Sequence, residues 1–132
     1  MCTSLTYENS RGDHFLARTM DFAFELGGQP IFMPRQQEIS GDAGTFTTKY
    51  GFIGAGRNLS HYIFVDGVNE FGLGAAALYF RGYAKYQQSA PADKLAIAPH
   101  DVVAWALGNA QSVADLPVSY THLRAHETRR HL

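Results

Sequence analysis

The sequence predicts an α+β fold in which five or six strands precede one helix. Short runs of alternating apolar and polar residues recur up to about residue 80, and segments rich in Gly, Asn and Asp separate them. One helical pattern follows Pro99, and neither an internal repeat nor a linker divides the chain. We therefore expect a single segment whose sheet is largely complete before the helix begins.

The first two strands are expected to form a hairpin at the extreme N-terminus. Residues 2–7 and 14–20 both mix apolar and polar side chains as extended segments do, and the sequence NSRGD at Asn9–Asp13 is a turn. Because the turn closes an antiparallel pair, the end of the second strand returns to the level of residue 2.

Later strands are indicated by β-branched and aromatic residues between turn residues. The expected strands are residues 29–34, 46–53, 61–65 and 73–80. Gly54 and Gly56 are read as the end of the second of these, and DGVNEFG at 66–72 as a turn that joins the last two in a second hairpin.

Residues 81–98 have no clear period and are expected to be loop. Pro99 is expected to open a helix that ends at Leu107 or Asn109, because Pro is tolerated in a first turn and Gly108 is a stop signal. One face of this helix carries four apolar residues, Val102, Val103, Ala106 and Leu107. A second helix is expected to begin near Ser112, three residues before Asp115.

Composition excludes several function classes. With 45% hydrophobic residues and a formal net charge of −1, the chain has no cationic footprint for nucleic acid or an anionic membrane. No stretch approaches the length of a membrane span, so the expected compartment is the cytoplasm. The single cysteine permits neither an intrachain disulfide nor a thiolate zinc cluster.

The last residues differ in character from the rest. Residues 118–132 hold three His, three Arg and one Glu, and the codons for Pro117–Glu127 can be written as the end of a transposase-type sequencing adapter. We expect residues 117–132 to be a non-native tail and residues 1–116 to be the domain portion. The alternative is a basic surface helix or interaction tail.

Cys2 follows the initiator methionine directly. Removal of Met1 would place a thiol and a free α-amine on one residue, and an α-amine with a pKa of about 8 can take the thiol proton at neutral pH. The expected hairpin brings Arg18 and Asp21 to the level of Cys2. Arg18 could then stabilise a thiolate and Asp21 could hold the amine, although an Arg and an Asp three residues apart often form a simple surface ion pair.

Several motifs resemble choloylglycine hydrolases and penicillin V acylases in order and spacing. They are MCTSL at the N-terminus, LARTMDF at 16–22, IFMPR at 31–35, TTKYGFIGAG at 47–56, DGVNEFGL at 66–73 and WALGNAQSV at 105–113. The resemblance implies the N-terminal part of an N-terminal-nucleophile hydrolase, a four-layer αββα sandwich that is truncated here. It also implies hydrolysis of a linear amide, in a conjugated bile salt or penicillin V, without metal or cofactor.

The same resemblance implies roles for individual residues. Cys2 corresponds to the nucleophile, and Arg18 and Asp21 to its supporting residues. Tyr79 lies where penicillin V acylases typically carry tyrosine and bile salt hydrolases asparagine, so it leans towards the acylase branch, with its backbone N–H in the oxyanion hole. Apolar walls of the substrate pocket are expected from Met20, Phe22, Phe24, Leu26, Tyr62 and Phe64, although a place in the core is an equal alternative.

Full-length members are more than twice as long and commonly tetrameric, and they supply a second oxyanion asparagine and a further arginine. We therefore expect the chain as written to be poorly stable and inactive. Two alternatives stay open. One is a non-enzymatic, β-rich binding module, and the other is a different branch of amidases with the same kind of nucleophile, such as an acyl-homoserine lactone acylase.

Overall fold

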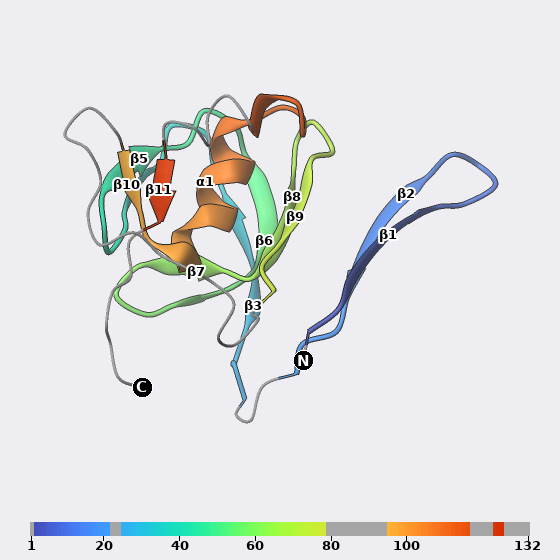
Figure 1. The fold of residues 1–132 in the computed structure, drawn as a ribbon, viewed down its shortest axis with the longest axis horizontal. Helices are drawn as coiled ribbons and strands as arrows, with labels where there is room; N and C mark the ends of the chain where they lie inside the picture. The colour runs from blue at the N-terminus through green and yellow to red at the C-terminus, as the bar shows by residue number, and fades with distance from the viewer. Residues whose placement is uncertain (1, 22–24, 79–94, 117–122, 126–132) are drawn as a thin grey trace.

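In a computed structural model of the protein, residues 2–21, 25–78, 95–116 and 123–125 are described, the last three as backbone alone. Figure 1 shows a strand-rich body that also contains helical ribbon, and a long hairpin that extends from it. None of the helices in these residues is long and apolar enough to cross a bilayer.

The described residues contain the following strands, 3₁₀ turn and α-helix. The strands are β1 (Ser4–Glu8), β2 (His14–Arg18), β3 (Gln29–Met33), β4 (Glu38–Ser40), β5 (Thr45–Thr47), β6 (Phe52–Asn58), β7 (Tyr62–Phe64), β8 (Asp66–Asn69), β9 (Gly74–Ala76), β10 (Leu95–Ile97) and β11 (Leu123–Ala125). The 3₁₀ turn η1 spans Pro99–Asp101, and α1 follows at Val102–Asn109.

The largest sheet has five strands in the order β3-β6-β8-β9, with β7 also paired to β6. Separate two-stranded pairs are formed by β1 with β2, by β4 with β5, and by β10 with β11. The described pairs are antiparallel except β10 with β11, which is parallel. The predicted α+β arrangement of strands before a helix is confirmed.

The predicted N-terminal hairpin is confirmed. Strands β1 and β2 pair from Ser4 with Arg18 to Glu8 with His14. The side-chain oxygen of Asn9 accepts hydrogen bonds from the backbone N–H groups of Arg11 and Asp13. Gly12 adopts a φ of 81°, which a residue with a Cβ rarely does. This turn therefore fixes the register of the hairpin.

Gly54 and Gly56 do not end a strand, as the sequence suggested, because β6 continues through both of them to Asn58. A Cβ on Gly54 would collide with the backbone oxygen of Asp66, and one on Gly56 would lie 2.6 Å from that of Ile63. Glycine is needed here because neighbouring backbones approach closely, not because the chain turns.

The second hairpin is present, but it pairs β8 with β9 and not the strands at 61–65 and 73–80 that the sequence predicted. Asp66–Asn69, read as part of a turn, form β8, and the turn proper is confined to the residues between Asn69 and Leu73. Strand β9 pairs with β8, whereas β7 pairs with β6. Strand β10 lies within the segment expected to be loop, and β4 was not expected.

The helix was placed correctly, but it is more deeply buried than one apolar face implies. Residues 103–108 are all buried, and α1 packs against β8 and β9. The core between helix and sheet contains Met33, Phe52, Phe64, Leu73, Val103, Trp105 and Leu107 among others. Phe52 and Phe64 meet edge to face at 4.8 Å between ring centroids.

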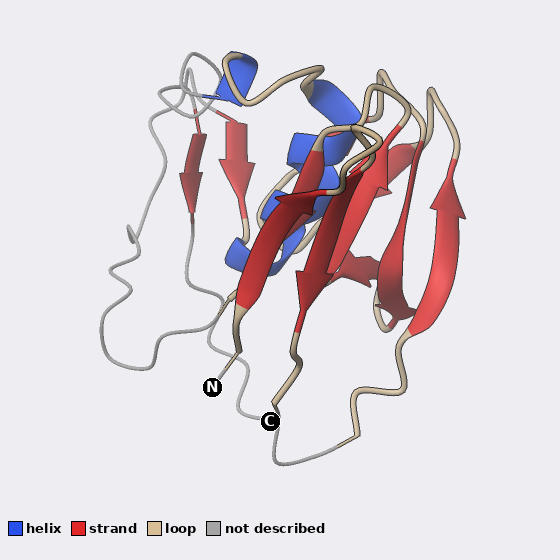
Figure 2. Ribbon diagram, turned by 90° about the vertical axis from the view of Figure 1, so that its right-hand side faces the viewer, coloured by secondary structure: helices blue, strands red, loops and turns tan. Residues whose placement is uncertain are grey.

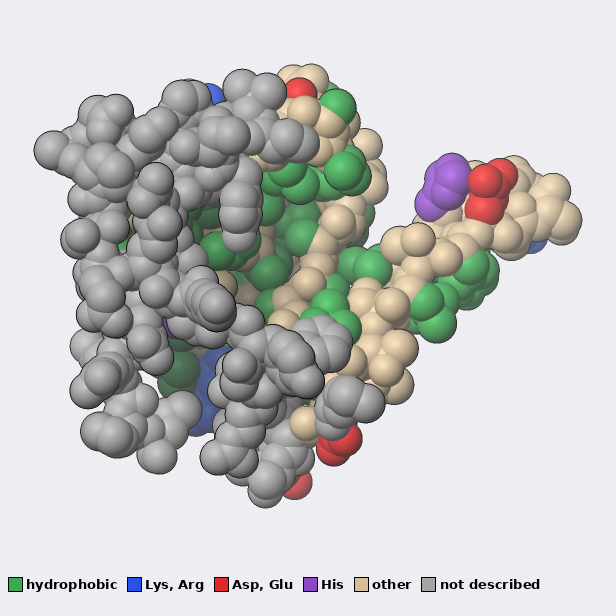
Figure 3. All heavy atoms as spheres, viewed as in Figure 1, with side chains coloured by type: hydrophobic (Ala, Val, Ile, Leu, Met, Phe, Trp, Pro, Cys, Tyr) green, Lys and Arg blue, Asp and Glu red, His purple; other side chains and the backbone are tan. Residues whose placement is uncertain are grey.

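The two faces of the five-stranded sheet have different neighbours. Figures 1 and 2 show α1 on one face and the β1–β2 hairpin on the opposite side. On the hairpin side, the sheet exposes Phe32, Ile53 and Val68, at 68%, 49% and 41% of their surface. Figure 3 shows hydrophobic side chains in the hollow between sheet and hairpin.

Two features are described after α1, a helical turn and strand β11. The Asp115 carboxylate accepts hydrogen bonds from the backbone N–H groups of Gln111 and Ser112, which lowers the pKa of Asp115 from its ordinary value. A helical turn begins there, as the Ser112–Asp115 spacing predicts. Beyond it, β11 lies in the segment expected to be a non-native tail and pairs with β10.

Candidate active site

Cys2 and Arg18 lie on the same face of the hairpin. Ser4 is directly opposite Arg18, and the pairing continues one residue further, where Thr19 donates its N–H to the carbonyl of Thr3 at 2.9 Å. Opposite residues share a face, and so do residues two apart on a strand. Cys2 is therefore the diagonal neighbour of Arg18, and it is buried, with 7% of its surface exposed.

The Arg18 guanidinium is held by the main sheet. Its Nη1 donates to the carbonyl oxygen of Val65 at 2.8 Å, and its Nε lies 3.8 Å from a carboxylate oxygen of Asp66. The Arg18 side chain is 8% exposed, although its Nη2 is buried without a hydrogen-bond partner in the described residues. A buried guanidinium with one free donor is suited to an anionic or carbonyl ligand.

Asp21 lies three residues after Arg18, beyond the end of β2. A hydrogen bond and charge attraction from the α-amine at the chain terminus lower the pKa of the Asp21 carboxyl. The amine that lowers this pKa belongs to Met1, so the role of Asp21 in holding the α-amine of Cys2 stays a prediction.

A cleft of about 650 Å³ lies between the hairpin and the main sheet. Leu16 and Arg18 line it from the hairpin, and Ile53, Asp66 and Val68 line it from the sheet. Most of its wall is apolar, with the Arg18–Asp66 pair as a polar group within it. Such a cleft suits a largely apolar molecule with a few polar groups.

The structure separates the residues expected as pocket walls. Phe22 and Phe24, like the expected oxyanion residue Tyr79, lie outside the described residues. Continuation of the hairpin register places Met20 across from Cys2, with 40% of its surface exposed. Phe64 is buried in the core against Phe52, which is the alternative that the sequence left open.

Leu26 and Tyr62 lie away from the main cleft. Tyr62 lines a different, more polar hollow beside Arg57, whose guanidinium donates to the carbonyl of Leu26 at 3.1 Å. Asp66 was missed as a partner of Arg18, because DGVNEFG reads locally as a turn. The sequence pointed to Asp66 only as the first residue of DGVNEFGL, one of the motifs that resemble choloylglycine hydrolases.

Residues 2–125 match the family described as linear amide C–N hydrolases, choloylglycine hydrolase family. A bile salt hydrolase/transferase from Clostridium perfringens is 34% identical over 119 residues, which are 88% of this chain and 36% of that protein. One from Lactiplantibacillus plantarum is 30% identical and also covers 88% of this chain and 36% of that protein.

The solved structures that resemble this chain include a bile acid hydrolase and a penicillin V acylase. The C2A mutant of the conjugated bile acid hydrolase from Clostridium perfringens superposes with a TM-score of 0.87 at 30% identity, over 97% of this chain and 40% of that one. Its R18L variant gives a TM-score of 0.86 at 27% identity, with the same coverage of both chains. A penicillin V acylase from Agrobacterium tumefaciens shares the fold, with a TM-score of 0.72 at 24% identity and the same coverage.

The chain spans a little over a third of the length of these curated relatives. The superpositions cover 97% of the chain and confirm the fold that the resemblance implied, the N-terminal part of an N-terminal-nucleophile hydrolase.

Proposed function

Because the chain belongs to the choloylglycine hydrolase family of linear amide C–N hydrolases, we propose that it carries the nucleophile part of an amidase site centred on Cys2. The observation that supports this most directly is the shared hairpin face of buried Cys2 and buried Arg18. The C2A and R18L substitutions in the solved Clostridium perfringens relatives carry the same two numbers and residue types.

In the proposed reaction, removal of Met1 frees the α-amine of Cys2. The amine takes the thiol proton, and the thiolate attacks the carbonyl carbon of the amide to form a tetrahedral intermediate. The C–N bond then breaks, the amine product leaves with the proton, and the acyl group stays on sulfur as a thioester. Water activated by the same α-amine hydrolyses the thioester and releases the acid.

Arg18 and Asp21 have supporting roles in this scheme. Asp21 holds the protonated α-amine of Cys2; the support is that its carboxyl already has its pKa lowered by the terminal amine of Met1, one residue away. Arg18 offers its buried Nη2 to the thiolate or to a polar group of the substrate. Because Asp66 and Val65 fix the guanidinium, it is oriented before a substrate arrives.

We propose a conjugated bile salt as the first substrate class and penicillin V as the second. The curated relatives are bile salt and conjugated bile acid hydrolases, and a steroid nucleus suits the apolar cleft beside Arg18. The tyrosine at position 79 favours the acylase side. Its backbone N–H, as an oxyanion donor, stays a prediction.

The remaining expectations extend this proposal. We propose a cytoplasmic protein that acts on small amides without nucleic-acid or membrane partners, and a tetrameric assembly for the whole enzyme. The domain boundary at residue 116 also stays a prediction, with the family match running on to residue 125.

The test is hydrolysis of glycine- and taurine-conjugated bile salts and of penicillin V, measured as release of the free amino acid or of the acyl acid. It is run on the chain alone and on the chain joined to the remaining part of the Clostridium perfringens relative. Cys2→Ala should abolish hydrolysis, and Ser10→Ala in the hairpin turn is the matched control.

A second arm tests the amine. A short N-terminal extension that blocks removal of Met1 should abolish turnover while leaving the thiol intact, because the α-amine is the base. Activity that survives either Cys2→Ala or the extension would overturn the proposal. Activity on neither substrate class by the joined protein, despite a folded structure, would favour the non-enzymatic alternative.

A further inference from the structure

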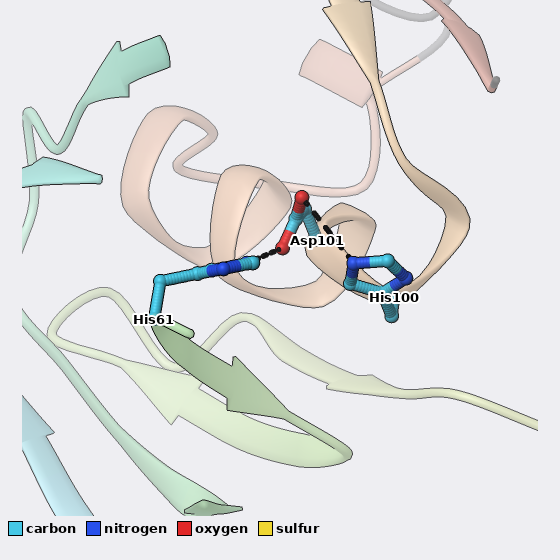
Figure 4. A group of neighbouring side chains, drawn as sticks. All are labelled: His61, His100 and Asp101. Atoms are coloured by element: carbon cyan, nitrogen blue, oxygen red, sulfur yellow. Dashed lines mark hydrogen bonds and ion pairs between the residues drawn. The ribbon is translucent and has the colours of Figure 1, made fainter. Parts of the chain in front are cut away.

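Two histidines and two aspartates converge where η1 leads into α1, apart from the hairpin that holds Cys2. His61 precedes β7, Asp42 lies in the turn between β4 and β5, and His100 and Asp101 belong to η1. Figure 4 shows the His61 and His100 rings approaching the Asp101 carboxylate from different elements. The ligand atoms of His61, His100 and Asp101 all lie within 4.8 Å of one another.

The cluster is shielded from solvent. The side chains of Asp101 and His61 are 2% and 9% exposed, and those of Asp42 and His100 are 17% and 30% exposed. Within the described residues, both carboxylates lie at ion-pair distance from the two histidines. An ion of charge +2 bound by neutral imidazoles would balance the charge of the two carboxylates in this largely buried place.

One ring nitrogen in the cluster is unused. The Nε2 atom of His100 is buried and lies 3.3 Å from Asp42 and 3.8 Å from Asp101, yet it has no hydrogen-bond partner in the described residues. A buried, unpartnered imidazole nitrogen that faces two carboxylates has the chemistry of a metal ligand.

We propose that His61, His100 and Asp101 bind a divalent transition-metal ion such as Zn²⁺, with a carboxylate oxygen of Asp42 as the fourth ligand. Two imidazole nitrogens with carboxylate oxygens are a common donor set for such ions. The metal is structural in this proposal and takes no part in amide hydrolysis.

The existing separations are close to what a metal requires. Ligand atoms of a tetrahedral site with bonds of about 2.0 Å lie about 3.3 Å apart. Nε2 of His61 lies 2.6 Å from Oδ1 of Asp101. Nε2 of His100 lies 3.3 Å from Oδ2 of Asp42 and 3.8 Å from Oδ2 of Asp101, while the ligand atoms of the two histidines and Asp101 all lie within 4.8 Å of one another. Small side-chain rotations that lengthen the His61–Asp101 distance and shorten the His100–Asp101 distance would open a central position for the ion.

Neighbouring groups already orient the ligands. The Nδ1 atom of His61 lies 3.1 Å from the hydroxyl oxygen of Ser60, so Nε2 is directed towards Asp101. The second carboxylate oxygen of Asp101 accepts the backbone N–H of Asp42 at 3.3 Å. Contacts of this outer kind hold ligands in place around metals in proteins.

The ligands also come from segments far apart in the sequence. Asp42 and Asp101 are separated by 59 positions, and His61 and Asp101 by 40. An ion shared by these residues would join the β4–β5 turn, the start of β7 and the start of α1. Metal binding should therefore stabilise the fold.

The test is titration of the EDTA-treated, dialysed chain with Zn²⁺ by calorimetry, with the bound metal counted by elemental analysis. We expect one equivalent with a micromolar or lower dissociation constant, and a rise in Tm of about 5–10 °C at saturation. Co²⁺ should give the visible absorption of a four-coordinate site.

His100→Gln is the informative variant, since the lost Nε2 makes no hydrogen bond in the metal-free structure. It should weaken Zn²⁺ binding at least tenfold and remove the rise in Tm, while the metal-free Tm stays within about 2 °C. His14→Gln, on the exposed end of the hairpin, is the matched control and should leave binding unchanged.

Two outcomes would overturn the proposal. One is no saturable binding below about 100 µM Zn²⁺, which would make the cluster a hydrogen-bond network alone. The other is Zn²⁺ binding that persists in His100→Gln and disappears when His122, His126 and His131 are replaced by Gln, which would place the ion on the C-terminal tail.

Discussion

Arg18 Nη1 donates a 2.8 Å hydrogen bond to the carbonyl oxygen of Val65, across 47 positions in the sequence. This bond ties the N-terminal hairpin to the main sheet at the junction of β7 and β8. The Asp66 carboxylate supports it at 3.8 Å from Arg18 Nε. The residue proposed to assist Cys2 is thus also an anchor of the hairpin.

Arg18→Leu should destabilise the protein by about 1.5–3 kcal/mol, the usual range for loss of a hydrogen bond to a charged group. Among the described residues, the Val65 carbonyl would keep only the N–H of Ala77, and the mostly buried Asp66 carboxylate only the N–H of Ala55. Urea unfolding measures the loss, and limited proteolysis should cut the hairpin faster in the variant.

Arg11→Leu is the control, because Arg11 is an exposed residue of the hairpin turn with a surface ion pair to Asp13. Its effect should stay within about 0.5 kcal/mol. Equal unfolding curves for the two leucine variants would show that Arg18 does not anchor the hairpin.

Asn69→Ala should be more damaging, at about 2–4 kcal/mol, because Asn69 is buried and makes four hydrogen bonds. Its Nδ2 donates to the carbonyls of Leu107 and Ala110 at the end of α1. Its Oδ1 accepts the N–H groups of Phe71 and Leu73 in the turn before β9.

Asn69→Asp provides a sharper measurement at the same position. It keeps the accepting oxygen but turns a carboxylate oxygen towards the two helix carbonyls, so it should be at least as destabilising as alanine at pH 7. Acid should partly relieve it, since a protonated carboxyl can donate to one carbonyl. A stable Asn69→Asp protein at pH 7 would contradict the hydrogen-bond assignment.

The hairpin was predictable from sequence because its determinants are local. Alternation in residues 2–7 and 14–20 and the turn at Asn9–Asp13 lie within one short segment, and they placed Arg18 beside Cys2. Strand β8 was missed because Asp66–Asn69 has the composition of a turn, whereas its pairing with β6 depends on residues further away.

Contacts between distant segments explain the other omissions. Gly54 and Gly56 lie within a strand because Asp66 and Ile63 of adjacent segments approach them, which no local pattern reveals. The pairing of His61 with Asp101 joins residues 40 positions apart, and neither residue belongs to a recognisable metal motif.

Glu70→Gln should give a pH-dependent loss of stability. Hydrogen bonds from Arg35 and from the Gly51 N–H hold the pKa of the Glu70 carboxyl below its ordinary value of 4.5. Because the folded pKa is lowered, the carboxylate contributes stability above pH 4.5, and the contribution is lost as pH falls through the folded pKa.

The urea midpoint of Glu70→Gln should therefore lie below that of the unmodified chain at pH 7, and the two should converge as the pH falls through the lowered pKa of Glu70. Glu38→Gln, at an exposed position on β4, is the control and should show no such convergence. A difference between Glu70→Gln and the unmodified chain that is constant with pH would contradict the assigned ion pair.

Gly108 and Thr48 form the contact between α1 and the loop before β6, and their coupling can be measured. A Cβ on Gly108 would lie 2.9 Å from Thr48 Cγ2 and 3.3 Å from its Cβ. Gly108→Ala should therefore destabilise the chain by about 1–3 kcal/mol through overpacking, less about 1 kcal/mol regained from the helix preference of alanine.

Thr48→Ser separates crowding from other causes. It removes the Cγ2 methyl but keeps the hydroxyl, which donates to the carbonyl of Pro34 at 2.7 Å and accepts the N–H of Gln37 at 3.0 Å. In the Gly108→Ala background, Thr48→Ser should recover stability, with a coupling of about 0.5–2 kcal/mol in a double-mutant cycle of urea unfolding. Additive effects would mean that the helix and the loop adjust independently, and that the close contact does not decide why glycine occupies position 108.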